Sequence, residues 1–148
     1  MKNILGIFTA LLISASVTAE PIEVKTDNGV LVGETNATIA AFKGVPFATP
    51  PVGNRRWKAP IAAPAWPGQR LATTFSPDCA QLPAAASFMP RPHMPSSEDC
   101  LYLNIWTPAV SDEKPAPVMV WIHGGSLKQG SGAVRYYDGE KLAQKGVV

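Results

Sequence analysis

The sequence of 148 residues has little of the material from which most reactive sites are built. It contains two cysteines and two histidines, and neither His93 nor His123 lies at metal-ligand spacing to a cysteine. Charges of the two signs nearly balance, with 13 Lys and Arg against 11 Asp and Glu, and they form no basic stripe. This composition gives no reason to propose a metal, a cofactor, a nucleic acid or an anionic membrane as a partner.

The sequence also lacks the G-x-S-x-G pattern that presents a serine nucleophile on a strand-to-helix turn. The nearest match, residues 124–128, has lysine in place of the last glycine. An apolar run from Val118 to Ile122 instead leads directly into His123-Gly124-Gly125. Five consecutive apolar residues after a proline predict a buried strand of a parallel sheet. Glycine at the end of such a strand lets backbone N–H groups turn toward a cavity.

The first 19 residues predict an export signal. Lys2 supplies positive charge, residues 4–17 are apolar, and Val17-Thr18-Ala19 is a small-residue cleavage signal that places the cut before Glu20. The apolar run is short for a membrane anchor, and no stop-transfer segment follows it. We therefore expect a secreted or periplasmic chain, residues 20–148, without stable membrane insertion after cleavage.

Cysteine usage agrees with export. Cys79 and Cys100 fit one disulfide in an oxidising compartment. Closing their loop, roughly 22 residues long, would stabilise the fold by about 3 kcal/mol on the chain-entropy model.

Alternating patterns predict a small antiparallel meander at the start of the mature chain. Residues 22–26 and 30–34 alternate apolar and polar positions, and residues 38–43 form a third short strand. Asp27-Asn28-Gly29 lies between the first two strands, and its Asn-Gly pair favours a two-residue type I′ turn.

Prolines dominate the next segment, because most of the fifteen lie between Pro46 and Pro95. Such a segment is expected to be extended chain and turns rather than helix. Four aromatic residues are expected to pin it to a core, namely Trp57, Trp66, Phe75 and Phe88.

Regular structure resumes with a predicted strand over residues 101–106. A short helix is predicted over residues 140–145, with Gly146 as its C-terminal stop. Val147-Val148 reads as the beginning of a further strand. Because a parallel strand needs neighbours, we expect the chain to be the N-terminal part of a longer protein, a gene remnant or an incomplete record.

Several blocks in collinear order resemble type-B carboxylesterases, and together they cover essentially the whole mature chain. They are residues 42–48 with 50–53 and Arg56-Trp57; then Trp66, Phe75, Cys79 and Gln81; then 97–106, 121–125, 130–132 and 137–139. The resemblance implies an α/β fold, the N-terminal part of an α/β-hydrolase. The small antiparallel meander would be followed by a Pro-rich loop and the first core strands.

The resemblance implies hydrolysis of a small-molecule carboxylic ester by a Ser-His-Glu or Ser-His-Asp triad. All three triad members are expected beyond residue 148, so none is assigned here. No such role is given to the serines and histidines that are present near the loop, namely Ser126, Ser131, His93 and His123. Because residues 80–96 contain no tryptophan, a quaternary ammonium ester is disfavoured as substrate.

The resemblance does imply one catalytic element, an oxyanion hole made of backbone N–H groups. On this loop the donors are Gly125 and Ser126, with Gly124 giving the chain room to turn. One such donor stabilises a transition state by roughly 3 kcal/mol. Two structural pairs are also implied, the family's first disulfide at Cys79–Cys100 and an ion pair between Arg56 and Glu98.

Three readings stay open at this point. The chain can belong to an ester hydrolase, to a non-catalytic secreted binding or adhesion homologue, or to an inactive fragment. The isolated 148-residue chain is predicted to be inactive in each case, because it holds no nucleophile or general base. No oligomeric state is implied.

Overall fold

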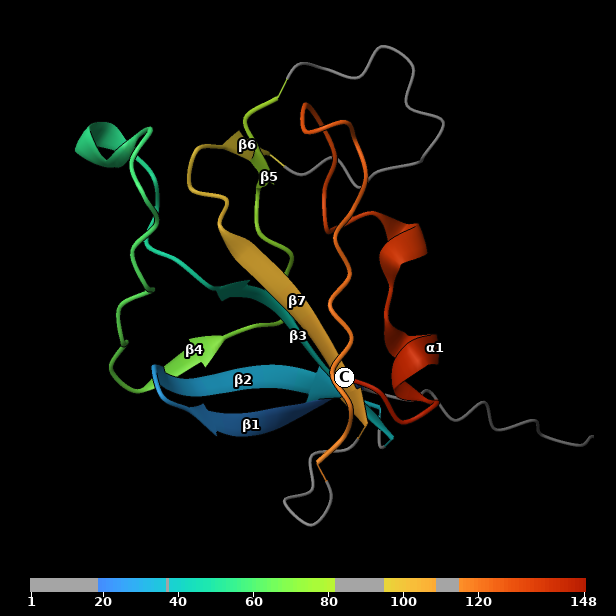
Figure 1. Ribbon diagram of the computed structural model, residues 1–148. Coiled ribbons are helices and arrows are strands. Elements are labelled where there is room, and N and C mark those ends of the chain that lie inside the picture. Colours follow the sequence, from blue (N-terminus) through green and yellow to red (C-terminus); the bar gives the residue numbers. More distant parts are fainter. Residues whose placement is uncertain (1–18, 37, 82–94, 109–114) are drawn as a thin grey trace, which may run out of the picture.

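The computed structural model describes residues 19–36, 38–81, 95–108 and 115–148. Its strands are β1 Glu20–Thr26, β2 Gly29–Thr35, β3 Ile39–Pro46, β4 Gln69–Leu71, β5 Asp78–Cys79, β6 Ser96–Ser97 and β7 Tyr102–Pro108. One α-helix, α1 Glu140–Ala143, lies beside β7, and 3-10 turns occupy Gly53–Arg55 and Arg135–Tyr137 (Figure 1). The main sheet has the order β1-β2-β3-β7, with β4 paired to β2, while β5 and β6 form a separate two-stranded ladder.

The predicted antiparallel meander is confirmed, but the predicted type I′ turn is wrong. Thr26 pairs with Gly29, so the turn residues are Asp27 and Asn28, and neither has the positive φ that type I′ requires. The positive φ, 139°, falls on Gly29 instead. The Thr26 hydroxyl explains this turn: it donates to the Gly29 carbonyl at 2.8 Å and accepts from the Asn28 N–H at 3.3 Å.

The Pro-rich segment contributes a strand to the sheet that the sequence patterns did not predict. β2 and β3 pair only near one end, at Glu34↔Ala41 and Thr35↔Ala40. Where they separate, β4 pairs with β2 in parallel. Ala72 continues this link, because its N–H donates to the Val32 carbonyl at 2.8 Å and its carbonyl accepts from the Lys43 N–H at 2.7 Å.

The four aromatics of this segment behave differently from one another. Trp66 packs against the core, and its indole N–H donates to the Val30 carbonyl at 3.1 Å, as expected of a pinning residue. Phe75 is half-buried beneath Lys43. The prediction is wrong for Trp57, which is 97% exposed in an open turn where no described residue covers it. Phe88 lies outside the described residues.

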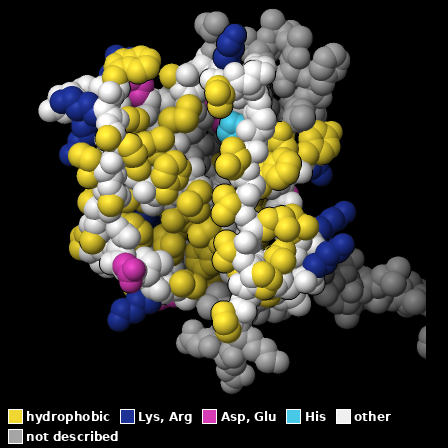
Figure 2. Space-filling view, in the orientation of Figure 1, with side chains coloured by type: hydrophobic (Ala, Val, Ile, Leu, Met, Phe, Trp, Pro, Cys, Tyr) yellow, Lys and Arg dark blue, Asp and Glu magenta, His cyan; other side chains and the backbone are white. Residues whose placement is uncertain are grey.

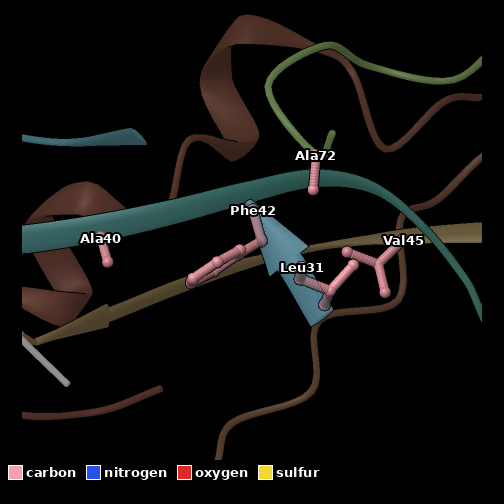
Figure 3. Close-up of a cluster of buried hydrophobic side chains, with 5 residues drawn as sticks. All are labelled: Leu31, Ala40, Phe42, Val45 and Ala72. Carbon is pink, nitrogen blue, oxygen red and sulfur yellow. The ribbon is translucent and has the colours of Figure 1, made fainter. Parts of the chain in front are cut away.

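The core is a small cluster between the strands. Its buried members come from β2, β3 and the residue after β4, and they are Leu31, Ala40, Phe42, Val45 and Ala72 (Figure 3). Ile22, Val24, Trp66 and Ile105 pack around them at partial burial. Along β3, Ala40 and Phe42 are two residues apart, so their side chains lie on the same face of the strand.

The predicted strand over residues 101–106 is confirmed as β7, which pairs antiparallel with β3. The register shifts between Phe42 and Val45, so β3 carries one extra residue and forms a β-bulge. Gly44 makes the bulge possible with a φ of 69°. The Asn104 side chain on β7 secures it, since its Oδ1 accepts from the Gly44 N–H at 3.0 Å.

The prediction of a buried strand at residues 118–122 is wrong. The five side chains are 73, 55, 79, 67 and 85% exposed in chain order, and no strand is formed there. Among the described residues its backbone pairs only with Val148, which donates to the Pro117 carbonyl at 2.9 Å and accepts from the Met119 N–H at 2.7 Å. These two bonds have the pattern of a parallel pair. The described residues cover the faces of this segment only slightly, mainly through the contact of the Trp121 ring with the Tyr137 ring, whose centres lie 5.6 Å apart.

The predicted C-terminal helix is confirmed in shorter form. α1 begins at Glu140, whose N–H donates a hydrogen bond to the Asp138 carboxylate at 2.9 Å. It ends at Ala143, and Gly146 follows with a φ of 89° and an N–H bond to the Ala143 carbonyl. Gly146 therefore acts as the expected stop. None of the helices in the described ranges is long and apolar enough to cross a membrane.

Candidate oxyanion site

The loop after residue 122 has an unusual backbone. Gly125, Ser126 and Leu127 have consecutive positive φ values of 134°, 56° and 58°. Only glycine adopts such angles without cost, so the two non-glycine residues are strained. The sequence indicates that Gly124 gives the chain room to turn, but Gly124 has no positive φ. The backbone conformation that requires glycine occurs at Gly125.

A tight turn closes behind Gly125. Its carbonyl accepts from the Lys128 N–H at 3.0 Å and the Gln129 N–H at 3.2 Å. A Cβ on Gly125 would collide with the Gln129 carbonyl oxygen and lie 2.6 Å from the carbonyl carbon, whereas one on Gly124 would meet nothing within 4 Å. Glycine is therefore required at position 125 for space as well as for backbone angle.

The N–H groups of Gly125 and Ser126 are free to bind a ligand. Within the described part of the chain, neither donates to a protein acceptor. Gly125 is half-buried and Ser126 is exposed. Successive N–H groups in a strained turn form a concave site for an anion or a developing oxyanion. The two residues predicted as oxyanion donors thus lie side by side with unused donors.

His123 contributes to the shape of the loop. Its Nδ1 lies 2.8 Å from the Gly124 carbonyl oxygen, a hydrogen bond in the tautomer that carries a proton on Nδ1. Gly130 packs closely against the Gly124 carbonyl and the His123 ring. A Cβ on Gly130 would lie 2.6 Å from the Gly124 oxygen and would collide with the His123 ring. The His123 side chain is exposed and has no second hydrogen-bond partner among the described residues, as suits a local turn stabiliser.

The side-chain amide of Gln81 binds Gly130, at the C-terminal end of the loop. The sequence patterns did not predict this contact. Its Nε2 donates to the Gly130 carbonyl at 2.9 Å, and its Oε1 accepts from the Gly130 N–H at 2.8 Å. The same Nε2 lies 3.1 Å from the Cys79 carbonyl oxygen. The only available signal was the place of Gln81 in the resemblance, two residues after Cys79.

A second side-chain amide anchors the next turn. Asn104, which already holds the β-bulge, donates through Nδ2 to the Gly132 carbonyl at 3.3 Å. Between the two anchors Ser131 is 7% exposed, and its hydroxyl accepts from the Ala133 N–H at 3.0 Å. Ser131 is therefore a structural residue.

The structural pairs implied by the sequence are formed. Cys79 and Cys100 are joined by a disulfide. Arg56 Nη2 lies 2.9 Å from Glu98 Oε1, and both side chains are about half exposed. An ion pair this exposed contributes about 0–1 kcal/mol to stability.

Tyr102, at the start of β7, lies in an environment that combines burial with two charged neighbours. Burial raises the pKa of Tyr102 above its ordinary value of 10.0, with a further rise from the Asp99 carboxylate and an opposing effect from Arg70. The Arg70 guanidinium lies over both Tyr102 and Trp66, at 5.9 and 5.6 Å from the ring centres. Among the described residues, no three His, Cys, Asp or Glu side chains gather in a metal-binding group.

The disulfide gives a direct chemical prediction. Protein expressed in an oxidising compartment should bind no alkylating reagent before reduction and two equivalents after it, because Cys79 and Cys100 are joined and the sequence has no other cysteine. Intact mass measurement of the two samples reads this out. Two thiols that react without a reductant would contradict the pairing.

Comparison with known proteins identifies the kind of enzyme in which this fold and loop occur. The profile of the carboxylesterase family matches residues 20–148. Fumonisin B1 esterase of Sphingopyxis macrogoltabida is 44% identical over 145 residues, covering 88% of this chain and 25% of that protein. Para-nitrobenzyl esterase of Bacillus subtilis is 41% identical over 129 residues, covering 84% and 25%.

Comparison with solved structures also finds esterases. A thermophilic PNB esterase superposes with a TM-score of 0.74 at 40% identity, covering 82% of this chain and 25% of the other. A second PNB esterase structure gives a TM-score of 0.77 at 40% identity, covering 84% and 26%. The described part of the chain therefore matches about a quarter of the structure of these α/β-hydrolase esterases. The chain belongs to the carboxylesterase family, and it spans about a quarter of the length of these relatives.

Proposed function

We propose that the chain is part of a carboxylic ester hydrolase, to which it supplies the oxyanion-binding loop. The observation that carries this proposal is the pair of unused, consecutive N–H groups of Gly125 and Ser126, held in a strained turn. Membership of the carboxylesterase family supports the reaction type.

The proposed chemistry is acyl transfer to a serine that lies beyond Val148. The serine oxygen bonds to the ester carbonyl carbon, a general base takes the serine proton, and the carbonyl electron pair moves onto oxygen. The Gly125 and Ser126 N–H groups donate to that oxyanion. Collapse of the intermediate expels the alcohol, and water then releases the acid. The role of this chain is electrostatic, because it stabilises charge that exists only near the transition state.

We further propose that residues 1–19 are an export signal and that residues 20–148 are the N-terminal part of a carboxylesterase domain. Two observations support this. The family match begins at residue 20, directly after the predicted cleavage site, and the disulfide suits an oxidising compartment. The mature protein would then be secreted or periplasmic.

The substrate class we propose is a small-molecule carboxylic ester. The class is kept this general because the relatives are named for chemically different esters, fumonisin B1 and para-nitrobenzyl esters. Acetylcholinesterase-1 of Trittame loki is also similar, at 44% identity over 114 residues, covering 74% of this chain and 20% of that protein. Residues 80–96 of this chain contain no tryptophan to bind a quaternary ammonium group, so we exclude choline esters from the proposal.

A chimeric enzyme tests the function. Residues 20–148 would replace the matching quarter of the Bacillus subtilis para-nitrobenzyl esterase, and hydrolysis of a p-nitrophenyl ester would be followed by absorbance. We expect turnover that a serine-directed phosphonate abolishes, while residues 20–148 alone give none above buffer. A folded, monomeric chimera without turnover would overturn the proposed role, and turnover by the isolated chain would show that its own residues suffice.

A further inference from the structure

We propose that Gln81 is a positioning residue for the oxyanion hole, an inference that rests on the proposed function of the Gly125–Ser126 amides. Gln81 touches neither donor. It fixes the loop that carries them by binding both polar groups of Gly130, at 2.9 Å and 2.8 Å.

The two hydrogen bonds from Gln81 fix both the position and the orientation of Gly130. One amide group donates to the carbonyl and accepts from the N–H of the same residue, as a neighbouring strand would do. A single hydrogen bond would allow Gly130 to swing about that contact. Two bonds to one residue restrict both its position and its orientation.

Gly130 transmits that restraint to the donors through direct packing. Its α-carbon lies so close to the Gly124 carbonyl and the His123 ring that no Cβ fits between them. Gln129, the residue before it, donates its N–H to the Gly125 carbonyl at 3.2 Å. A shift of Gly130 therefore moves both the residue before Gly125 and the bond that closes the Gly125 turn.

Gln81 itself is held firmly. Its neighbour Cys79 is covalently joined to Cys100 and lies in β5, which pairs with β6. Ala80 extends this ladder through its N–H bond to the Ser97 carbonyl at 3.1 Å. The side chain is also restrained by the bond between Nε2 and the Cys79 carbonyl. The disulfide-bearing ladder is thus the rigid support, and Gln81 is the link from that support to the loop.

This arrangement predicts a specific kinetic signature. Loss of the link would let the Gly125 and Ser126 N–H groups sample positions away from the oxyanion, while the ester itself binds as before. Because misplacement by about 1 Å costs on the order of 100-fold in rate, kcat should fall by about 10- to 100-fold with KM little changed.

The variant for the test is Gln81→Met in the esterase chimera, since methionine keeps the length of the side chain and removes both hydrogen-bonding groups. The matched control is Gln69→Met. Gln69 lies on β4, is exposed, and donates to the Glu23 carboxylate at 2.6 Å, a bond that does not involve the loop. Affinity for a trifluoromethyl ketone, whose adduct with a serine carries an oxyanion, should fall by the same factor as kcat/KM in Gln81→Met and stay unchanged in Gln69→Met.

A second measurement does not depend on catalysis. Hydrogen exchange of residues 123–130, read by mass spectrometry on the same chimera, should accelerate across the loop in Gln81→Met and not in Gln69→Met. Unchanged kcat and ketone affinity in Gln81→Met, or faster exchange confined to Gly130, would overturn the proposal. An inactive wild-type chimera would count against the proposed function alone, and exchange would still decide whether Gln81 orders the loop.

Discussion

Alanine in place of Gly125 is expected to lower kcat/KM of the esterase chimera by at least about 100-fold, the loss typical of one missing oxyanion donor. Gly125 has a φ of 134°, and an added Cβ would collide with the carbonyl of Gln129. The turn from Gly125 to Gln129 must then open, and both donor N–H groups leave their present orientation. Steady-state kinetics with a p-nitrophenyl ester measure the effect.

The control for this prediction is Gly68→Ala. Gly68 also has a positive φ, 67°, but nothing lies within 4 Å of a Cβ there, and it is far from the loop in sequence and contacts. It should cost about 1 kcal/mol of backbone strain and leave kcat/KM unchanged. A Gly125→Ala enzyme with the activity of Gly68→Ala would show that the donors do not depend on this turn.

Local patterns were sufficient for those elements whose stability is mostly local. Residues 22–26 and 30–34 were predicted as two strands on either side of a short turn. β1 and β2 form that hairpin, in which every pairing partner is close in sequence. The helix at Glu140 has a carboxylate before it and a glycine after it, which are sufficient start and stop signals.

Elements that depend on distant partners escaped prediction. β4 exists because β2 and β3 separate and leave backbone groups to satisfy, a fact that no local pattern contains. Residues 118–122 show the opposite failure. An apolar run is buried only where other elements pack over it, and the described residues leave all five of these side chains more than half exposed.

The residues of the candidate site also fall into those that local sequence could predict and those that it could not. Gly125 and Ser126 were predicted from the Gly-Gly turn and the family resemblance, and the backbone angles then located the strain one residue later than Gly124. Gln81 could not be predicted to bind Gly130, because 49 residues separate the two in sequence. Only folding of the disulfide segment against the loop brings them together.

Residues 20–148, expressed without any other segment, are expected to aggregate at micromolar concentration. The side chains of residues 118–122 are all more than half exposed, and those of Leu127 and Tyr136 are exposed as well. Figure 2 shows hydrophobic side chains gathered on the face that this segment crosses. Apart from its bonds to Val148, the backbone of this segment pairs with no strand in the described part of the chain. An apolar segment with an open edge is a template for pairing between molecules.

Charge placed on that segment should reverse the effect. Ile122→Lys, at a side chain that is 85% exposed, removes apolar surface and adds repulsion between copies, so the soluble fraction should rise several-fold. Ile61→Lys is the matched control, because Ile61 is 56% exposed but lies in the Pro-rich segment, outside this patch. Size-exclusion chromatography and sedimentation of the three proteins give the comparison. A wild-type 20–148 chain that elutes as a monomer and unfolds in one sharp thermal transition would contradict this prediction, because its own small core would then be sufficient for a stable fold.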